Sequence, residues 1–470
     1  MKPLRAGSRL WSGVLLILAT VAGAAPAATQ GKDPVPPGTT WTFAAAGDAL
    51  ITRQVGMFGD DPAFMGLVNP IRAADAAIIN LEVNLFHLWE FKGYPQAENG
   101  GNYELGPPQA ASDMKWMGFD MFNLATNHTT DYGVEGMFET MRLFDQLNLV
   151  WAGVGMTAGE AAQARYFETP KGRFALIGMA TSFTPMSRAA DPRPEVRGRP
   201  GLNALRTTSV NQLAPAQMAD LRKLVQATGG TVPESETASV RFGGATFVQG
   251  PENGTRATVN AIDEDRILRS VRNAARQADH VIVYSHSHDI GRDTAPAAEH
   301  LRTFIKKCLD AGAHAFIISG PHTLRGFEIY NGKPIFYSLG DFFMQNETIE
   351  PVPTDMMEVQ GLGIEALAAD YYLARAMPDP VTGFPTRYHP ANPAVWESVV
   401  PVATFEGHKV TRIVFYPVDM GFRVPAAHQG TPRLADPVLG KKILEGFAKM
   451  SEIYGTKIVI RDGVGVWEAP

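Results

Sequence analysis

The chain has 470 residues, of which 45% are hydrophobic and 19% are charged, with a formal net charge of −6. This is the composition of an ordinary globular protein, long enough for one large core or two domains. A mildly acidic chain gives no reason to expect nucleic-acid binding, which usually requires a basic stripe. Cys308 is the single cysteine, so an intramolecular disulfide is excluded, and its helical surroundings predict a buried side chain.

Residues 1–24 have the pattern of a secretory signal peptide. Three cations open this segment: Lys2, Arg5 and Arg9. The apolar run Trp11–Val21 and a set of small residues follow, so we expect cleavage after Ala24 or Ala27 and a protein that is secreted, periplasmic or at the cell surface. The alternative is an uncleaved anchor, although the run is short for a bilayer span of about 20 residues. The polar segment 25–40, rich in Pro and Gly, predicts a disordered lead-in.

Short apolar runs then alternate with helical patterns, which is typical of a layered α/β protein. The predicted strands are Thr42–Ala46, Ala76–Asn80, Met121–Ala125, Leu149–Ala152, Phe174–Met179, His280–Ser285 and Ala315–Ser319. The predicted helices are Glu135–Leu147, Ile267–Gln277 and Ala297–Ala311. Asn331-Gly332 between Phe327–Tyr330 and Pro334–Ser338 is a strong signal for a β-hairpin. These elements define a main domain, residues 41–345.

Several segments depart from this rhythm. Asn84–Ser112 is rich in Gly and Asn and predicts a surface loop. Residues 182–263 resemble an insertion, with one helix at Ala214–Ala227, that is able to roof a site. Residues 346–395 predict a loop-rich connection, and residues 396–470 predict a hairpin and a helix that complete the domain. The elements of this last part are Ser398–Phe405, Val410–Tyr416, Pro437–Met450, Lys457–Ile460 and Gly465–Trp467.

Polar side chains follow five of the predicted strands at the point where each strand ends. They are Asp48, Glu82, Asn127 with His128, His286 with His288, and His322. Ligands bind beyond the carboxyl ends of strands in open α/β sheets, so we expect these groups to converge at one edge of a shared sheet. Each group alone has a simpler interpretation: Asp131 can be a helix cap before Glu135, and Asp341 is interpreted as a cap or turn residue rather than a site member.

Carboxylate, imidazole and amide oxygen together suit a divalent Zn, Mn or Fe ion. A carboxylate that bridges two such ions would allow hydrolysis at a phosphorus or carbonyl centre. His128 is the expected proton donor to the leaving group. Isolated buried carboxylates would otherwise repel each other, so the sequence predicts a site with one or two ions.

The order of these motifs resembles that of the CapA-like family of poly-γ-glutamate capsule biosynthesis proteins. The chain reads GDALITR, NLE, LATNHTTDYG, GVGMTAGEA, His286 and then DAGAHAFIISGPHTLRGFEIYNGKPIFYSLGDFF, over Thr42–Phe343. The family is similar to calcineurin-like metallophosphoesterases, which implies a four-layer double β-sandwich flanked by helices. The resemblance implies a set of metal ligands: Asp48, Glu82, Asn127, His286 and His322. It also implies that His128 is catalytic, with Arg53 and Asp131 near the substrate.

Three motifs depart from the family pattern. Leu50 and Gly320 stand where the superfamily has histidine ligands, and the HWG element reads His286-Ser287-His288. His288 is a candidate substitute ligand. A site with three protein ligands per ion can still function when water completes the coordination.

The leading hypothesis is an exported metal-dependent hydrolase of phosphoester or amide bonds. Its substrate would be a small molecule or an anionic surface polymer such as poly-γ-glutamate, within a membrane-associated polymer-synthesis complex. The alternative is a non-catalytic scaffold that binds the polymer through a degraded metal site. A third hypothesis is an enzyme with a changed substrate whose pocket is formed by residues 182–263.

Overall fold

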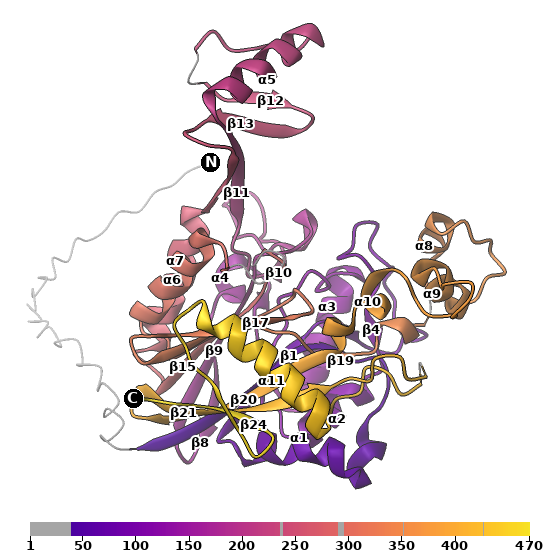
Figure 1. The fold of residues 1–470 in the computed structure, drawn as a ribbon, viewed down its shortest axis with the longest axis vertical. Coiled ribbons are helices and arrows are strands. Elements are labelled where there is room, and N and C mark those ends of the chain that lie inside the picture. The colour runs from indigo at the N-terminus through magenta and orange to yellow at the C-terminus, as the bar shows by residue number, and fades with distance from the viewer. Residues whose placement is uncertain (1–38, 236–237, 290–295, 351, 426) are drawn as a thin grey trace, which may run out of the picture. The chain divides into compact units, whose positions relative to one another are not determined.

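Two large mixed β-sheets organise the described part of the chain (Figure 1). The computed structural model describes residues 39–235, 238–289, 296–350, 352–425 and 427–470. The expected signal peptide, and the lead-in up to residue 38, lie outside these residues. The described residues all belong to one unit, residues 34–470. Among them, no helix combines the length and apolar character that a membrane crossing requires.

The larger sheet has ten strands in the order β23-β24-β21-β20-β1-β2-β5-β6, with β19 beside β1 and β22 beside β21. Its first half comprises β1 (Thr40–Leu50), β2 (Ala76–Leu81), β5 (Met121–Asn123), β6 (Val150–Ala152) and β19 (Asp341–Met344). These five strands pair in parallel. The rest of the sheet is antiparallel: β20 (Glu397–Glu406), β21 (Lys409–Asp419), β22 (Arg433–Leu434), β23 (Val459–Arg461) and β24 (Val464–Glu468).

The second sheet has six strands in the order β17-β18-β16-β15-β9-β8. They are β8 (Arg165–Thr169), β9 (Gly172–Ala180), β15 (His280–His286), β16 (Ala315–Ser319), β17 (Leu324–Tyr330) and β18 (Lys333–Leu339). The four inner strands pair in parallel, and β8 and β17 close the two edges in antiparallel fashion.

Alternation of apolar side chains explains how these sheets pack. In β1, Trp41, Phe43 and Ala45 join one buried cluster, while Ala44 and Ala46 join another. In β15, Ile282 and Tyr284 join the first of these clusters, and Val281 and Val283 join a third. Successive side chains of a strand point to opposite faces, so a strand buried on both faces needs apolar residues at every position. The shared cluster therefore lies between the two sheets, and each outer face has its own core.

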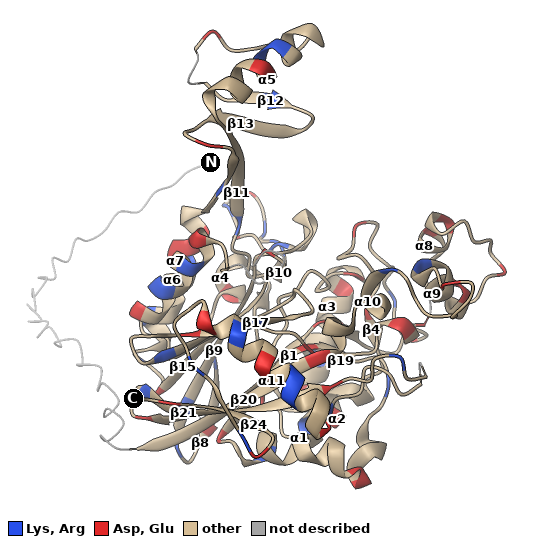
Figure 2. Ribbon diagram, in the orientation of Figure 1, with Lys and Arg blue, Asp and Glu red and all other residues tan. Residues whose placement is uncertain are grey.

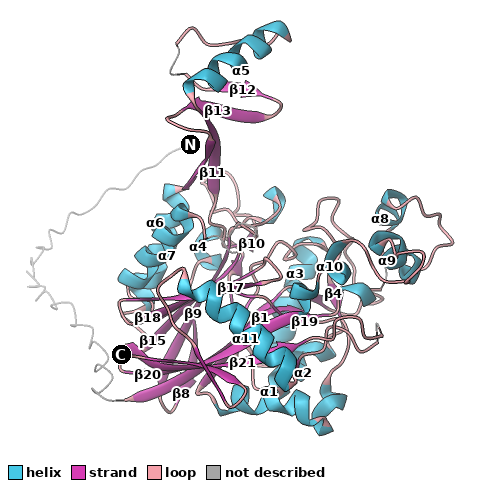
Figure 3. Cartoon of the chain, viewed as in Figure 1, coloured by secondary structure: helices cyan, strands magenta, loops and turns pink. Residues whose placement is uncertain are grey.

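Helices supply the partners of the two outer faces (Figure 3). Those packed with the larger sheet are α1 (Pro62–Ala73), α2 (Gln109–Trp116) and α3 (Gly133–Gln146). Those packed with the smaller sheet are α6 (Ala261–Ala274) and α7 (Glu299–Asp310), and α7 buries Cys308. Helix α11 (Pro437–Glu452) packs with the cluster shared by the sheets. Basic and acidic side chains are interspersed along α6, α7 and α11, as Figure 2 shows.

The segment 182–263 contains a separate four-stranded sheet, β12-β13-β11-β14. Its elements are β11 (Thr207–Leu213), α5 (Pro215–Ala227), β12 (Val240–Phe242), β13 (Ala245–Gln249) and β14 (Gly254–Val259). Met218, Val225 and Val240 form its small core. The remaining elements are short: η1 (Gly56–Asp60), β3 (Asn84–Leu85), β4 (Leu105–Gly106), β7 (Val154–Gly155), α4 (Ala158–Ala161), η2 (Pro185–Ser187), β10 (Gly201–Leu202), η3 (Asn346–Thr348), α8 (Thr354–Val359), α9 (Ala368–Ala376), α10 (Tyr388–Ala391) and η4 (Pro393–Trp396).

The α/β class is confirmed, and each predicted strand and helix has a counterpart. The turn at Asn331 and Gly332 has φ values of 52° and 76°, which is the double positive φ of a type I′ hairpin. The prediction of a surface loop over Asn84–Ser112 is wrong at both ends. Residues 84–86 and 102–106 are buried, either in short strands or next to them. The prediction was wrong because the Gly- and Asn-rich composition of the segment does not indicate the apolar and polar side chains that it inserts into the core.

Candidate metal centre

The end of strand β1 places Asp48 between two polar neighbours. In the parallel registers, Asp48 lies opposite Asn80 of β2 on one side and opposite Asp341 of β19 on the other. Both pairings shift register here, so the strand is irregular where the carboxylate emerges. Glycine is required at position 47 because the backbone of Gly340 lies so close that a Cβ atom at position 47 would be 1.8 Å from the Gly340 carbonyl oxygen.

Hydrogen bonds hold the Asp48 carboxylate in place. Oδ1 accepts from Asn80 Nδ2 (2.6 Å) and Ser319 Oγ (2.5 Å), and Oδ2 accepts from the backbone N–H of Gly320 (2.7 Å). Burial opposes ionisation of this group, but His286 and these bonds bring the pKa of Asp48 below its usual value. Asp48 is therefore an oriented anion with lone pairs left for a further partner.

The lack of space for a side chain explains why position 320 is a glycine, and its N–H group binds Asp48. Its φ is +123°, and a Cβ atom would come within 2.8 Å of the Ser287 backbone. A histidine at this position would collide with the neighbouring strand end. Leu50, the other position where a ligand is missing, is buried in the core that faces the helices. Both departures from the family pattern therefore fit the local packing of this chain.

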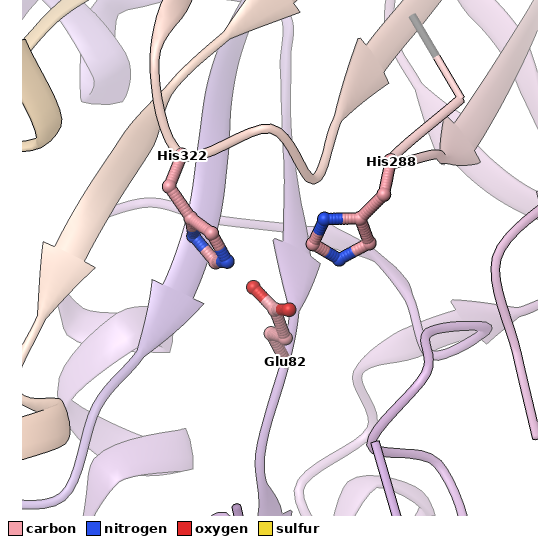
Figure 4. Close-up of side chains that lie close together, drawn as sticks. All are labelled: Glu82, His288 and His322. Atoms are coloured by element: carbon pink, nitrogen blue, oxygen red, sulfur yellow. The ribbon is translucent and has the colours of Figure 1, made fainter. Parts of the chain in front are cut away.

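Four side chains of this region are arranged as a metal-binding group. One ligand atom from each of Asp48, Glu82, His322 and Asp341 lies within 4.8 Å of the others, and all four residues are buried or nearly so. A second group, Glu82, His288 and His322, overlaps the first (Figure 4). Figure 4 shows the imidazoles of His288 and His322 directed at the carboxylate of Glu82 from two loops.

His286 connects the two groups. Its Nδ1 lies 3.3 Å from Asp48 Oδ1, and its Nε2 lies 3.3 Å from Glu82 Oε1 and 3.2 Å from His288 Nε2. The ring is completely buried, and burial lowers the pKa of His286 despite the nearby Asp48. A neutral imidazole offers a lone pair, which is the form that binds a metal.

Glu82 shows most clearly that a cation fits here. Its side chain is completely buried, and neither of its oxygens has a hydrogen-bond partner among the described residues. Asp341 Oδ2 has none in that part of the chain either. Burial, and then the charges of Asp48 and Asp341, raise the pKa of Glu82 well above its usual value. A buried carboxylate without partners is costly unless a cation or a proton compensates it, and oxygen and imidazole donors are the ligands of borderline divalent metals.

His322 is oriented by the carboxylate beside it. Its Nδ1 donates to Asp341 Oδ1 at 2.9 Å, which leaves Nε2 as the nitrogen available to an ion. Although burial opposes the charge, Asp341 raises the pKa of His322 to about 9. His322 has φ +56°, an uncommon conformation for a residue with a side chain and one that is frequent at functional sites.

His128 and Asp131 form a second polar pair. His128 Nδ1 donates to Asp131 Oδ2 at 2.7 Å, and the same oxygen accepts from the backbone N–H of Glu104 at 2.8 Å. Burial lowers the pKa of His128, but the charge and hydrogen bond of Asp131 together with the charge of Glu104 make the net shift upward. The interpretation of Asp131 as a helix cap is wrong, because α3 begins after Tyr132 without a side-chain cap.

A cavity of about 630 Å³ opens above these residues. Its walls include His128, His288 and His322, together with Asn127. Asn127 Nδ2 donates to the Gly100 carbonyl at 3.0 Å, while its Oδ1 is buried without a partner among the described residues. Among the described residues of the segment 182–263, only residues 182–185 contribute to the wall, and the small sheet of β11–β14 does not.

The structure thus brings together Asp48, Glu82, His286, His288 and His322, with Asn127 and His128 on the adjoining wall. The expectation of one shared sheet edge is wrong. Asp48 lies near the end of β1 and Glu82 follows β2, both in the ten-stranded sheet, whereas His286 ends β15 and the loop of His322 follows β16 in the six-stranded sheet. The carboxyl ends of both sets of parallel strands meet because the sheets pack face to face.

Other residues are placed differently from the sequence prediction. Arg53 donates to the backbone carbonyl of Gln429 and does not line this cavity, and Asp131 acts through His128 rather than from the cavity wall. The interpretation of Asp341 as a cap or turn residue is also wrong, since it lies in β19 within the metal-binding group. Asp341 carried the same signal as the other members: a carboxylate beside an apolar strand.

The sequence prediction did not include several residues of the cavity wall, among them Glu104, Arg375 and His389. Burial, opposed by the charge of His128, raises the pKa of Glu104 to about 7. The ring of His389 lies 4.7 Å from that of His322, centroid to centroid. No signal in the sequence marks these residues, because they come from segments without clear periodicity.

Comparison with known proteins identifies a family and several relatives to which this chain is similar. Residues 42–346 match the family described as "Bacterial capsule synthesis protein PGA_cap". An uncharacterised protein of Sinorhizobium fredii, y4sH, is 38% identical over 431 residues, which cover 91% of this chain and 92% of the relative. The PGA biosynthesis protein CapA of Bacillus subtilis is 25% identical over 302 residues, or 63% of this chain and 61% of that protein. The capsule biosynthesis protein CapA of Bacillus anthracis is 24% identical over 64% and 59% of the two chains.

Proposed function

The chain belongs to the PGA_cap family of bacterial capsule synthesis proteins, and from this premise we propose that it is an exported metal-dependent hydrolase. The observation that carries the proposal is the buried group Asp48, Glu82, His322 and Asp341, in which neither oxygen of Glu82 has a hydrogen bond among the described residues and Oε1 has only the 3.3 Å contact with His286 Nε2. Three carboxylates gathered without a cation would repel one another, so the group is suited to holding one.

The residues that would hold the metal fall into two overlapping sets. Asp48, Glu82, His322 and Asp341 form the first set, and Glu82 and His322 with His288 form the second. We propose one or two Zn, Mn or Fe ions, with His286 and Asn127 as further ligands and Glu82 shared between the two sets. A bound divalent ion of this kind supplies a hydroxide nucleophile at neutral pH and polarises the reacting centre.

His128 is the proposed general acid. It lies on the cavity wall, and its Nδ1 is occupied by Asp131, so Nε2 is the nitrogen available to a leaving group. The raised pKa of His128 keeps the imidazolium, which is the proton-donating form, populated near neutral pH. Asp131 is a positioning residue because it fixes the ring and supports its positive charge.

The fold is consistent with this chemistry. Two face-to-face sheets with a helical core on each outer side are the arrangement from which we infer a metallophosphoesterase-like four-layer β-sandwich. The names of the Bacillus relatives point to poly-γ-glutamate or capsule metabolism. We therefore propose a phosphoester or an amide linked to a surface anionic polymer as the substrate, and a location outside the cytoplasm near a membrane-associated synthesis complex.

A non-catalytic, polymer-binding role is the second candidate. Leucine and glycine at positions 50 and 320 favour it, since each removes one ligand of the superfamily pattern. His288 faces Glu82 and so offers a replacement for one of them. The choice between the two roles therefore depends on whether a bound ion is present and supports turnover.

Metal analysis of the purified full chain, followed by assays with bis-p-nitrophenyl phosphate before and after chelation, tests the proposal. We expect at least one bound divalent ion per chain and hydrolysis that chelator abolishes and added metal restores. His128→Ala should retain the ion and lose turnover, whereas the exposed His408→Ala serves as the matched control. A stoichiometric ion without hydrolysis of phosphoester or amide probes would establish the binding role instead.

A further inference from the structure

The cavity beside the metal-binding group carries two opposite charges that do not pair with each other. Glu104 and Arg375 both line it. Glu104 is 0% exposed, and neither of its oxygens has a hydrogen-bond partner among the described residues. Arg375 Nη1 is likewise buried without a partner in that part of the chain. An unpaired buried charge is costly, so this arrangement needs an explanation.

The structure holds Arg375 in place by other means. Its guanidinium lies 4.8 Å from the centre of the Tyr388 ring, in a cation–π contact. Tyr388 has φ +57°, so the backbone adopts a strained conformation at the residue that supports this cation. The guanidinium is near enough to act on Glu104, since burial raises the pKa of that carboxyl and the charge of Arg375 opposes the rise. The two groups are thus positioned on one cavity without neutralising each other directly.

We propose that Glu104 and Arg375 form a subsite for a ligand end that carries both an ammonium and a carboxylate, as a free α-amino-acid end does. The ammonium would donate to the Glu104 carboxylate, and the carboxylate would accept from the Arg375 guanidinium, whose planar fork suits that anion. The Glu104 oxygens and Arg375 Nη1 then gain hydrogen-bond partners from the ligand. A purely anionic ligand would leave Glu104 unpaired and be repelled by it.

The inference deepens the proposed function by naming the substrate class. An amino-acid unit bound through its α-ammonium and α-carboxylate can present only its side chain to the metal-binding group. The reacting bond is then a phosphoester or an amide on that side chain. Phosphoester and amide substrates share the zwitterionic end, and matched probes distinguish the two classes.

Calorimetric titration of the purified full chain tests the subsite without requiring turnover. The phosphoester probes are O-phospho-L-serine, O-phosphoethanolamine, which lacks the carboxylate, and 3-phosphooxypropanoate, which lacks the ammonium. The amide probes are L-glutamine, its α-amide and N-acetyl-L-glutamine. We expect the complete zwitterion of at least one set to bind about tenfold or more tightly than either analogue, the usual effect of one charged hydrogen bond.

Two variants separate the contributions of the charges. Glu104→Gln should abolish the preference over the probe without ammonium and preserve the preference over the probe without carboxylate, and Arg375→Met should do the reverse. Glu358→Gln and Arg387→Met, both at exposed positions outside the cavity, should preserve both preferences. Thermal melts confirm that each variant is folded.

Binding ratios within twofold in both probe sets for the wild-type protein would overturn the subsite, as would unchanged ratios in folded Glu104→Gln. Release of phosphate and ammonia is measured separately on the same probes. Selective binding without release would refute the hydrolase while supporting the subsite. Hydrolysis of bis-p-nitrophenyl phosphate without zwitterion selectivity would refute the subsite alone.

Discussion

Glu82→Gln is the change that examines the metal centre most directly. Glutamine keeps the shape of the side chain but removes the charge and one of the two acceptor oxygens that lack partners. Ligand atoms in the group lie within 4.8 Å, so two ionised carboxylates repel by about 3.5 kcal/mol at an effective dielectric constant of 20. Burial and then this repulsion both favour the protonated form of Glu82, which is the direction in which its pKa is raised.

The expected effect follows from linkage. A metal present at about 100 times its dissociation constant stabilises the wild-type protein by about 2.7 kcal/mol, which corresponds to a rise in Tm of about 3 °C for a chain of this length. We expect Glu82→Gln to lose this rise while its metal-free Tm stays within about 2 °C of the wild type. Because the folded pKa of Glu82 is raised, the metal must displace a proton from Glu82, so the metal affinity of the wild type should increase with pH.

Differential scanning fluorimetry of chelator-treated protein, titrated with Mn²⁺ and Zn²⁺, measures both effects. Glu347→Gln is the matched control, because Glu347 also has a buried oxygen without a partner among the described residues and a pKa raised by burial to about 7, but it is not part of the metal-binding group. The control should keep the metal-dependent rise. A full wild-type rise in Glu82→Gln would refute the assignment of Glu82 as a ligand.

Three further predictions concern catalysis, folding and export. His128→Ala should preserve the metal-dependent rise in Tm and lower any hydrolytic rate by about 10²–10⁴-fold. Asp131→Asn should lower the pKa of His128 and so shift the pH–rate profile to lower pH. Profiles of the two variants that coincide with that of the wild type would contradict both roles. Asn331 has φ +52°. Asn331→Val should lower Tm by about 1–2 °C, since a left-handed conformation costs about 1–2 kcal/mol for a residue with a β-branched side chain, whereas Asn331→Gly should leave Tm unchanged. Mass spectrometry of the mature protein should find its first residue near Ala25 or Ala28. Retention of the intact N-terminus in soluble cytoplasmic protein would contradict the export prediction.

Local patterns were sufficient for the secondary structure of the core. Continuous apolar runs predicted β1, β2, β9, β15 and β16, because a strand that is buried on both faces must be apolar throughout. Amphipathic periodicity located α3, α6, α7 and α11, and Asn331-Gly332 located the hairpin turn. Motif order over Thr42–Phe343 also identified the family correctly, since residues 42–346 match it. These properties depend on neighbours in the chain, so the sequence contains them directly.

Only the tertiary structure decided how the site is assembled. Packing of two sheets brings Asp48 and Glu82 of one against His286 of the other, an arrangement that no single strand encodes. Parallel pairing of β1 with β19 moves Asp341 beside Asp48, although the two residues are far apart in the chain. Glu104 and Arg375 meet on one cavity through segments without periodicity. Contacts between distant segments are fixed by the packing of faces and the register of strands, and these follow from the whole core rather than from the residues that form the site.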